Sequence, residues 1–351
     1  MYAKMHHSSG LHFSRPLASL LTVTLAAFAG LSLFAAPCAW SQNDSPKTPT
    51  ILTDLLPEGL INLSNRPEFS ENFLVVDMSK RFLRVYKNEE GLPRLLLEVP
   101  SDLGKRTGPK QKENDHKTPV GIYFLQEKKS PPEIPFDLYG QLAFTTDYPN
   151  IFDKRDRKTG SGIWLHAVPD NVPLTRGSRG CVVVRNDIIK DLAPFVHLNQ
   201  TPIVIFDSMK EIKKDEYLKQ RQEFVNFVET WRQAWQDEDI DTYIKFYDPT
   251  FFNADMNYKQ WYRHKKWLKG RYKYIRVNLS EPVIIKNNDQ VVIRLLQQYE
   301  SDKHSDFGEK TIHAHYSPET GFKIVREDWK PIPMPNTWIA ETSKRTLSTT
   351  Q

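Results

Sequence analysis

The pattern most suggestive of chemistry is Ser178-Arg179-Gly180-Cys181, with His166 fifteen positions before the cysteine. A thiol attacks a carbonyl carbon well only as the thiolate, and a neighbouring imidazole can take its proton and form an ion pair with it. Gly180 has no Cβ, so the backbone around Cys181 can approach a reacting carbonyl and direct amides at a developing oxyanion. These residues predict a cysteine nucleophile with a histidine base. The alternative is that Cys181 is a small buried apolar side chain, the commoner place for a free cysteine.

The N-terminal segment, residues 1–41, predicts export. Lys4 and Arg15 are its only fully charged residues, and an apolar run extends from Leu17 to about Trp40. This is typical of a secretory signal, although a run of about twenty apolar residues could also remain as a membrane anchor. A lipoprotein is disfavoured because Pro37 precedes Cys38, where lipid attachment requires a small, flexible residue. We therefore expect a periplasmic protein, with this segment either cleaved or kept as an anchor.

Charge and cysteine content narrow the function classes further. The formal net charge is +5, and it falls to +3 without the two positive charges of residues 1–41. Together with export, this weakly basic balance disfavours a nucleic-acid partner. Cys38 and Cys181 are the two cysteines of the chain, and Cys38 lies in the exported segment. We therefore expect no structural disulfide in the folded part.

The chain divides into a linker and two domains. Residues 42–70 are rich in Ser, Pro, Thr and Asn, which predicts a linker that ends in a short helix near 51–56. Residues 71–210 contain short β-type runs at hairpin-like spacing and one helix at 186–195, capped by Asn186 or Asp187. This predicts a mainly β domain. The expected strands are 73–77, 82–86, 95–99, 121–125, 163–168, 181–184 and 202–206.

Residues 215–331 predict a second domain of the α+β class. Apolar side chains recur at helical spacing from Tyr217 to Asp237, two shorter helices follow, and alternating strands complete the domain before a tail at 332–351. Such a module has its own core, so cutting the chain near Lys213 should leave a soluble catalytic part. A homodimer is possible. The shorter helices are expected at 240–247 and 258–268, and the strands at 272–285, 290–299, 311–316 and 322–328.

Three motifs give residues 71–210 a family resemblance. Thr118-Pro119-Val120-Gly121, Gly162-Ile163-Trp164-Leu165-His166 and Ser178-Arg179-Gly180-Cys181 follow one another in the order found in YkuD domains, the catalytic domains of L,D-transpeptidases. The resemblance implies a β-sandwich with a short helix. The second domain resembles the NTF2-like fold, and the pairing of the two is similar to that in the cell-shape L,D-carboxypeptidases of curved Gram-negative bacteria.

The resemblance also implies a reaction, substrate and site. Members work on peptidoglycan stem peptides without a cofactor or metal. Cys181 would attack the carbonyl of the third stem residue and expel the terminal D-alanine, while His166 shuttles the proton. The carbonyl of Ala167, where many members have glycine, would orient the imidazole, and Gly180 would lie in the oxyanion region.

The acyl acceptor stays open at this level. Water would make the protein a carboxypeptidase that trims tetrapeptide stems to tripeptides. The side-chain amine of a second stem would make it a transpeptidase that forms crosslinks or handles attachment of proteins to the wall. We favour trimming because of the attached second domain. A non-catalytic wall-binding protein with a degenerate site is the weakest alternative, since it would have little reason to keep His166, Gly180 and Cys181 together.

Substrate recognition is expected around the nucleophile. Many transpeptidases carry an arginine two positions after the cysteine, where this chain has Val183. Carboxylate recognition would then fall to Arg176, Arg179 or Arg185, because guanidinium groups bind carboxylates in a bidentate manner. Ser178 is the remaining candidate for substrate binding.

Two further patterns are open to more than one interpretation. His313-x-His315 places two imidazoles on one face of a strand, which could bind a metal, but structural histidines are favoured and no metal is expected. Residues 258–273 interleave Lys and Arg with Tyr and Trp. The favoured interpretation is a helix and strand with aromatic side chains in the core and lysines in solvent. The alternative is a surface for an anionic glycan or lipid.

Overall fold

The computed structural model describes residues 55–253 and 255–338. The predicted signal or anchor lies outside these residues, as do the first part of the predicted linker and most of the tail. Within the described residues, no helix combines the length and apolarity needed to cross a membrane.

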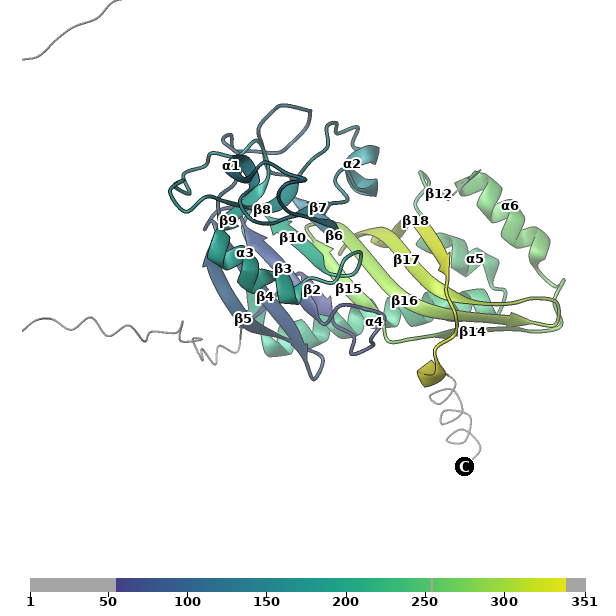
Figure 1. Cartoon of the computed structure of the whole chain (residues 1–351). Helices are drawn as coiled ribbons and strands as arrows, with labels where there is room; N and C mark the ends of the chain where they lie inside the picture. Colours follow the sequence, from purple (N-terminus) through teal and green to yellow (C-terminus); the bar gives the residue numbers. More distant parts are fainter. Residues whose placement is uncertain (1–54, 254, 339–351) are drawn as a thin grey trace, which may run out of the picture. The chain divides into compact units, whose positions relative to one another are not determined.

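The catalytic domain is one curled eight-stranded sheet (Figure 1). The strand order is β5-β4-β3-β10-β6-β7-β8-β9, and the register of β6 shifts between Leu125 and Lys128. The two halves that meet at this irregularity enclose a single apolar core. The mainly β prediction is therefore confirmed. The strands are β3 (Asn72–Asp77), β4 (Phe82–Glu89), β5 (Leu92–Pro100), β6 (Gly121–Lys129), β7 (Ala143–Thr146), β8 (Trp164–Val168), β9 (Val182–Arg185) and β10 (Pro202–Phe206), and the helices are α1 (Phe136–Tyr139), α2 (Ile151–Arg155) and α3 (Asn186–Leu192), which a 3₁₀ turn (Ala193–Phe195) extends.

The predicted capping of α3 is wrong. Arg185 is the N-cap residue, without a side-chain hydrogen bond. The buried Asn186 side chain instead accepts a hydrogen bond at 2.9 Å from the amide of Gln141, which belongs to a distant loop. Asp187 accepts at 2.9 Å from the amide of Ile188, its own neighbour. The Asn186 side chain, which the local pattern predicts as the helix cap, is thus hydrogen-bonded to a distant loop instead.

The second domain is α+β, as predicted. Helices come first, and the antiparallel sheet has the order β18-β17-β16-β15-β2, where β2 is Leu60–Asn62, with β14 also paired to β16. The expected strand at 272–285 is two strands, because Pro282 cannot donate to the ladder and the chain breaks at 280–282. The elements are α4 (Lys214–Gln236), α5 (Ile240–Tyr243), a 3₁₀ turn (Ile244–Phe246), β12 (Phe252–Asn253), β13 (Met256–Asn257), α6 (Tyr258–Leu268), β14 (Ile275–Leu279), β15 (Val283–Asn287), β16 (Gln290–Ser301), β17 (Ser305–Ser317) and β18 (Gly321–Pro331).

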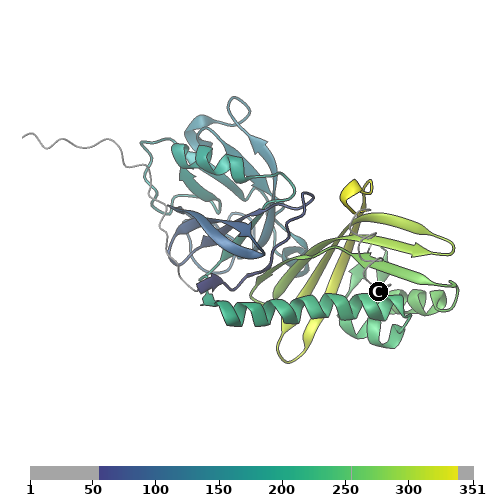
Figure 2. The same ribbon diagram turned by 90° about the horizontal axis from the view of Figure 1, so that it is seen from below.

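The long helix α4 covers one face of this sheet (Figure 2). Its buried stripe includes Phe224, Phe227, Val228 and Trp231, at the spacing that the sequence predicts. These side chains pack on residues of β15, β16 and β17 that point to the same face of the sheet. The apolar residues at helical spacing thus form the face of α4 that packs on the sheet.

The segment expected to be a linker is part of the sheets. β1 (Leu55–Pro57) pairs antiparallel with β11 (Glu211–Lys213), and β2 (Leu60–Asn62) pairs with β15. The predicted short helix is therefore wrong at residues 55 and 56, and the linker is wrong for residues 55–62. Leu60 and Ile61 are fully buried, so this segment adds an edge strand to the second domain before the chain enters the catalytic domain.

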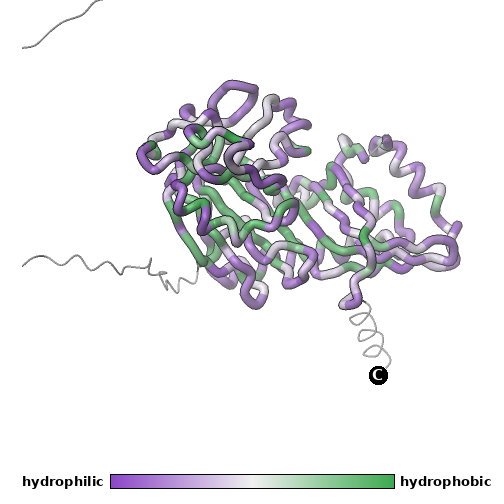
Figure 3. The backbone as a smooth tube through the Cα atoms, viewed as in Figure 1, coloured by the Kyte–Doolittle hydropathy of each residue, from purple (hydrophilic) through white to green (hydrophobic). Residues whose placement is uncertain are grey.

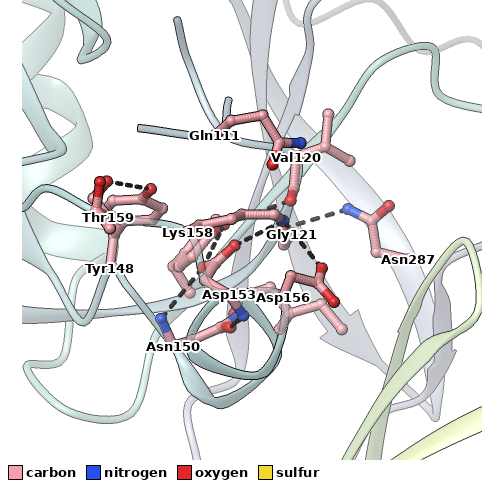
Figure 4. Close-up of polar contacts among 12 residues, drawn as sticks. Gln111, Val120, Gly121, Tyr148, Asn150, Asp153, Asp156, Lys158, Thr159 and Asn287 are labelled. Atoms are coloured by element: carbon pink, nitrogen blue, oxygen red, sulfur yellow. Dashed lines mark hydrogen bonds and ion pairs between the residues drawn. The ribbon is translucent and has the colours of Figure 1, made fainter. Parts of the chain in front are cut away.

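The other face of the second domain's sheet is buried against the catalytic domain. Asn287 at the end of β15 donates hydrogen bonds to the carbonyls of Gly121 (3.3 Å) and Ile205 (2.7 Å), as Figure 4 shows for Gly121. Each domain has an apolar cluster of its own, as expected, but the two domains also share a third cluster, so they are not independent. Members of the shared cluster include Phe73, Val75, Val204 and Phe206 from one domain and Val283, Ile285, Val292 and Leu296 from the other.

We predict that a chain ending at Lys213 does not stay soluble. The cut would expose Phe73, Val75, Val204 and Phe206, and each buried side chain of this kind contributes about 1.5–3 kcal/mol. Size-exclusion chromatography after expression measures the outcome. A chain ending at Trp338, which keeps both domains, is the control. A folded monomer of residues 55–213 would show that the shared core is dispensable.

Candidate active site

The predicted nucleophile and base lie on one face of the sheet. β8 and β9 run parallel, with Leu165 beside Val182 and His166 beside Val183. Leu165 and Val182 belong to the core, and successive strand residues alternate between faces. His166 and Cys181, which directly precedes Val182, therefore both lie on the face away from the core. The register thus places the two residues that carry the predicted chemistry on the same face of neighbouring strands.

The imidazole of His166 is fixed by the neighbouring carbonyl. Its Nδ1 lies 2.6 Å from the oxygen of Ala167, so Nδ1–H donates this bond and Nε2 is the atom that can accept a proton. Ala167 lies in β8, and glycine is not required there. Burial lowers the pKa of His166 to about 4, and the bond to Ala167 offsets only part of this effect. The imidazole is therefore neutral near pH 7.

The thiol of Cys181 is also neutral in the resting site. The residue is 8% exposed, and its Sγ donates a hydrogen bond to the carbonyl of Gly162 at 3.5 Å. Burial raises the pKa of Cys181 to about 11, and the Trp164 backbone and the Lys110 ammonium offset this in part. The geometry thus differs from the expected ion pair. His166 would remove the proton only as the sulfur attacks.

Gly180 and Ser178 shape the loop that presents the nucleophile. Gly180 has φ +130°, and a Cβ there would lie 2.7 Å from the carbonyl oxygen of Lys117. The Ser178 hydroxyl donates to the carbonyl of Cys181 (2.8 Å) and accepts from the amide of Gly180 (3.1 Å). The Gly180 amide is therefore engaged inside the loop, and Ser178, expected to bind substrate, holds the loop's shape.

The three arginines expected at the substrate carboxylate differ in their surroundings. Arg185 donates to the carbonyls of Asp170 (2.9 Å) and Val172 (3.0 Å), so its guanidinium secures the chain before the nucleophile loop. Arg176 donates to the carbonyl of Met78 at 3.4 Å. Arg179 is exposed. Arg176 and Arg179 keep the better access to a substrate carboxylate.

Asp102 is a positioning residue that the sequence analysis missed. It is 3% exposed, and its carboxylate accepts from the Arg81 guanidinium (2.7 Å), from the amide of Gly177 (2.8 Å) and from the amide of Arg176. Its backbone exchanges two hydrogen bonds with Val183 in β9. Asp102 therefore ties the nucleophile loop to the strand that follows Cys181. No sequence signal could have shown this, because the contact spans more than seventy residues.

We predict that Asp102→Ala lowers turnover at least about tenfold and stability by about 2 kcal/mol. The change leaves two loop amides and Arg81 without their acceptor, and each buried group left unsatisfied costs about 1–3 kcal/mol. Urea unfolding and peptide turnover measure the two effects. The control is Asp170→Ala, an exposed carboxylate in the neighbouring turn. Equal turnover for the two variants would contradict the positioning role.

A loop at residues 130–140 covers the base. The Tyr139 ring of α1 packs edge-on against the His166 ring at 5.1 Å and lies 4.9 Å from the Trp164 ring. Gly140 ends the helix with φ +63°, and a Cβ there would lie 2.6 Å from the Cβ of Ala167. The loop at residues 130–140 therefore packs closely against β8 at Gly140. It restricts the space beside His166.

A second loop, residues 105–118, is fixed beside the nucleophile by Asp115. Its carboxylate accepts from the Lys110 ammonium (2.8 Å) and from the amides of Gln111 (2.8 Å) and Lys117 (3.1 Å). Burial opposes ionisation, but these hydrogen bonds hold the pKa of Asp115 below its usual range. Gln111 in turn accepts from the amide of Thr159 at 3.0 Å, beside the Asp153 network in Figure 4. The Lys110 charge is thereby held in place near Cys181.

The two histidines of β17 form part of the contact between the domains. His313 and His315 lie on one strand face, as expected, with ring centroids 5.8 and 5.3 Å from that of Phe152 in α2. His315 Nδ1 lies 2.8 Å from a carboxylate oxygen of Asp289. In residues 55–253 and 255–338, no group of three or more His, Cys, Asp or Glu side chains is arranged to hold a metal ion.

Comparisons with known proteins agree with this architecture. The L,D-transpeptidase catalytic domain (YkuD) matches residues 71–205, and the Cds6 C-terminal NTF2-like domain matches residues 223–328. The structure of Bdellovibrio bacteriovorus Bd1075 is 54% identical and covers 80% of this chain and 100% of its own, with a TM-score of 0.75. The helical cell shape determining protein Pgp2 from Campylobacter jejuni is 28% identical and covers 77% of this chain and 95% of its own, with a TM-score of 0.61.

A search of curated proteins found no match. The two matched domains and the similarity to Bd1075 along that protein's whole length nevertheless agree with the Cys181 and His166 geometry. The chain therefore belongs to the family in which a YkuD L,D-transpeptidase catalytic domain is followed by a C-terminal NTF2-like domain.

Proposed function

We propose that this protein is an L,D-carboxypeptidase that trims peptidoglycan tetrapeptide stems to tripeptides in the periplasm. The observation that carries the proposal is the placement of Cys181 and His166 on one face of the β8–β9 pair, with Nδ1 bonded to Ala167 and Nε2 able to accept a proton. This arrangement suits acyl transfer by a thiol and a general base.

The reaction begins when Sγ of Cys181 bonds to the carbonyl carbon of the third stem residue while its proton passes to Nε2 of His166. The tetrahedral intermediate then breaks its C–N bond, and His166 gives the proton to the departing amine of D-alanine. Water attacks the thioester as His166 takes one of its protons. The C–S bond breaks, the thiol regains its proton, and the tripeptide carboxylate leaves.

Water is favoured as acceptor because of the cover over the base. The acceptor must approach the thioester next to His166, and the Tyr139 ring lies against that imidazole. A water molecule needs less room there than the side chain of a second stem peptide. The similarity to a helical cell shape determining protein also supports a trimming role, since carboxypeptidase action changes wall structure without adding crosslinks.

Incubation of the chain with purified disaccharide-tetrapeptide, followed by mass spectrometry, tests the proposal. We expect a disaccharide-tripeptide and free D-alanine. Heavy-oxygen water should place one labelled atom in the new carboxylate of the tripeptide. Crosslinked dimers as the main product would instead make the protein a transpeptidase, and no product at all would leave a wall-binding protein.

A further inference from the structure

The outer face of α6 carries a stripe of cations and a tryptophan. Lys259, Arg263 and Trp267 follow one another at intervals of four residues, so they lie along one side of the helix. All three are exposed, and Trp267 is 59% exposed. The opposite side packs into the core through Tyr258, Trp261 and Tyr262, which are partly buried there. Figure 3 shows α6 as a mainly hydrophilic segment.

The favoured sequence interpretation is therefore only partly correct. Tyr258, Trp261 and Tyr262 pack on the core as expected. Trp267 instead remains exposed, and Lys265, expected in solvent, is buried. Tyr274, just beyond this segment, is exposed as well. The exposed aromatic rings need a different explanation.

Cations lie on these rings. The guanidinium of Arg271 is 4.0 Å from the ring centre of Trp267, and that of Arg276 is 5.0 Å from the ring centre of Tyr274. The Lys266 ammonium lies over Tyr262 at 4.8 Å. Each cation thus covers a ring face, while the remaining ring surface stays open to solvent. We call the set formed by Lys259, Arg263, Lys266, Trp267, Arg271, Lys273, Tyr274 and Arg276 the α6 patch.

The charge of this region is strongly positive. Residues 256–280 contain eight Lys or Arg residues and no Asp or Glu, whereas the whole chain has a net charge of +5. Four carboxylates border the patch: Asp241 lies 3.8 Å from Lys266, Glu300 lies 3.6 Å from Arg276, Asp302 accepts from the amide of Lys273, and Glu238 accepts from the amide of Gly270. They leave most of the cations available. The positive charge of the protein is therefore concentrated here.

We propose that the α6 patch docks the protein on an anionic phospholipid surface. Tryptophan and tyrosine favour the headgroup region of a bilayer, and lysine and arginine pair with anionic lipid phosphates. A glycan fits less well, because sugar rings stack on aromatic faces and Arg271 and Arg276 already lie on those of Trp267 and Tyr274. The docking is independent of the acyl-transfer site and would restrict the enzyme to wall close to a membrane.

Vesicle co-sedimentation tests the docking. The protein begins at Thr48, because the N-terminal apolar segment would bind vesicles by itself. The probes are vesicles of phosphatidylcholine alone and vesicles with phosphatidylglycerol added. The charge variant is Lys259→Glu with Arg263→Glu. Both side chains are exposed, and an acidic side chain at Lys259 lies in the first turn of α6, where it is favourable, so this variant should fold.

The matched control is Lys214→Glu with Lys219→Glu, two exposed cations at equivalent places in the first half of α4. We expect the protein to bind the vesicles that contain phosphatidylglycerol and not those of phosphatidylcholine alone. The α6 variant should lower this binding at least about tenfold, and the control should lower it less than about twofold. At high salt, which screens the ionic contacts, Trp267→Ala should bind more weakly than the unchanged protein. Equal binding by both variants, or patch-dependent binding to isolated sacculi without vesicle binding, would overturn the proposal.

Discussion

Cys181→Ala should abolish turnover of tetrapeptide stems while the protein stays folded. The variant removes the sulfur that would form the acyl intermediate. The side chain is small and 8% exposed, so loss of one sulfur atom should change the fold little. Cys181→Ser should also be inactive, because a hydroxyl at this position forms an anion far less readily than a thiol. Mass spectrometry of released D-alanine measures turnover.

The trapped intermediate gives this prediction a direct control. Wild-type protein mixed with substrate and quenched with acid should gain the mass of an acyl group on the peptide that contains Cys181. Ser178→Ala should still form this adduct, because its hydroxyl is hydrogen-bonded within the loop. Product formation by Cys181→Ala at near the wild-type rate would exclude a cysteine mechanism.

His166→Ala should lower kcat/KM at least about a hundredfold, the usual contribution of a general base. The base must be neutral to act, and burial lowers the pKa of His166 to about 4. The kcat/KM of the wild type should therefore rise with pH through about pH 4 and already be level at pH 6.5, where an ordinary imidazole would be half protonated. His197→Ala, which changes an exposed histidine, is the control.

Alkylation of Cys181 distinguishes a neutral pair from an ion pair. Because burial raises the thiol pKa to about 11, the thiolate fraction, and with it the iodoacetamide rate, should grow about tenfold per pH unit from pH 6 to 9. A thiolate–imidazolium pair would give a rate independent of pH in this range. A level alkylation profile would show that the ion pair expected from the sequence forms after all.

The shared core between the domains had a sequence signal that the domain division did not use. Val283-Ile284-Ile285 and Val291-Val292-Ile293 are continuous apolar runs rather than alternating ones. Continuous runs indicate strands that are buried on both faces. One face of this sheet packs under the helices and the other on the catalytic domain. The runs could have predicted a second packing partner, but they could not have named it.

Short elements were the least predictable. The chain at 55–62 forms edge strands because partners at Ile212 and Ile285 lie beside it in the folded chain. Its composition alone resembles a linker. The break between β14 and β15 could have been read from Pro282, since proline interrupts a strand ladder.

The sequence by itself determined the fold class of the two domains and the candidate site. Residue types and order within three local motifs identify Cys181, His166 and Gly180, and the change from strand to helical period marks the second domain, because these signals depend on neighbours along the chain. Tertiary structure alone decided the protonation states of Cys181 and His166 and how Asp102 holds the loop before Cys181. Burial of Cys181 and His166, and the hydrogen bonds of Asp102, arise only when distant segments pack together and exclude water.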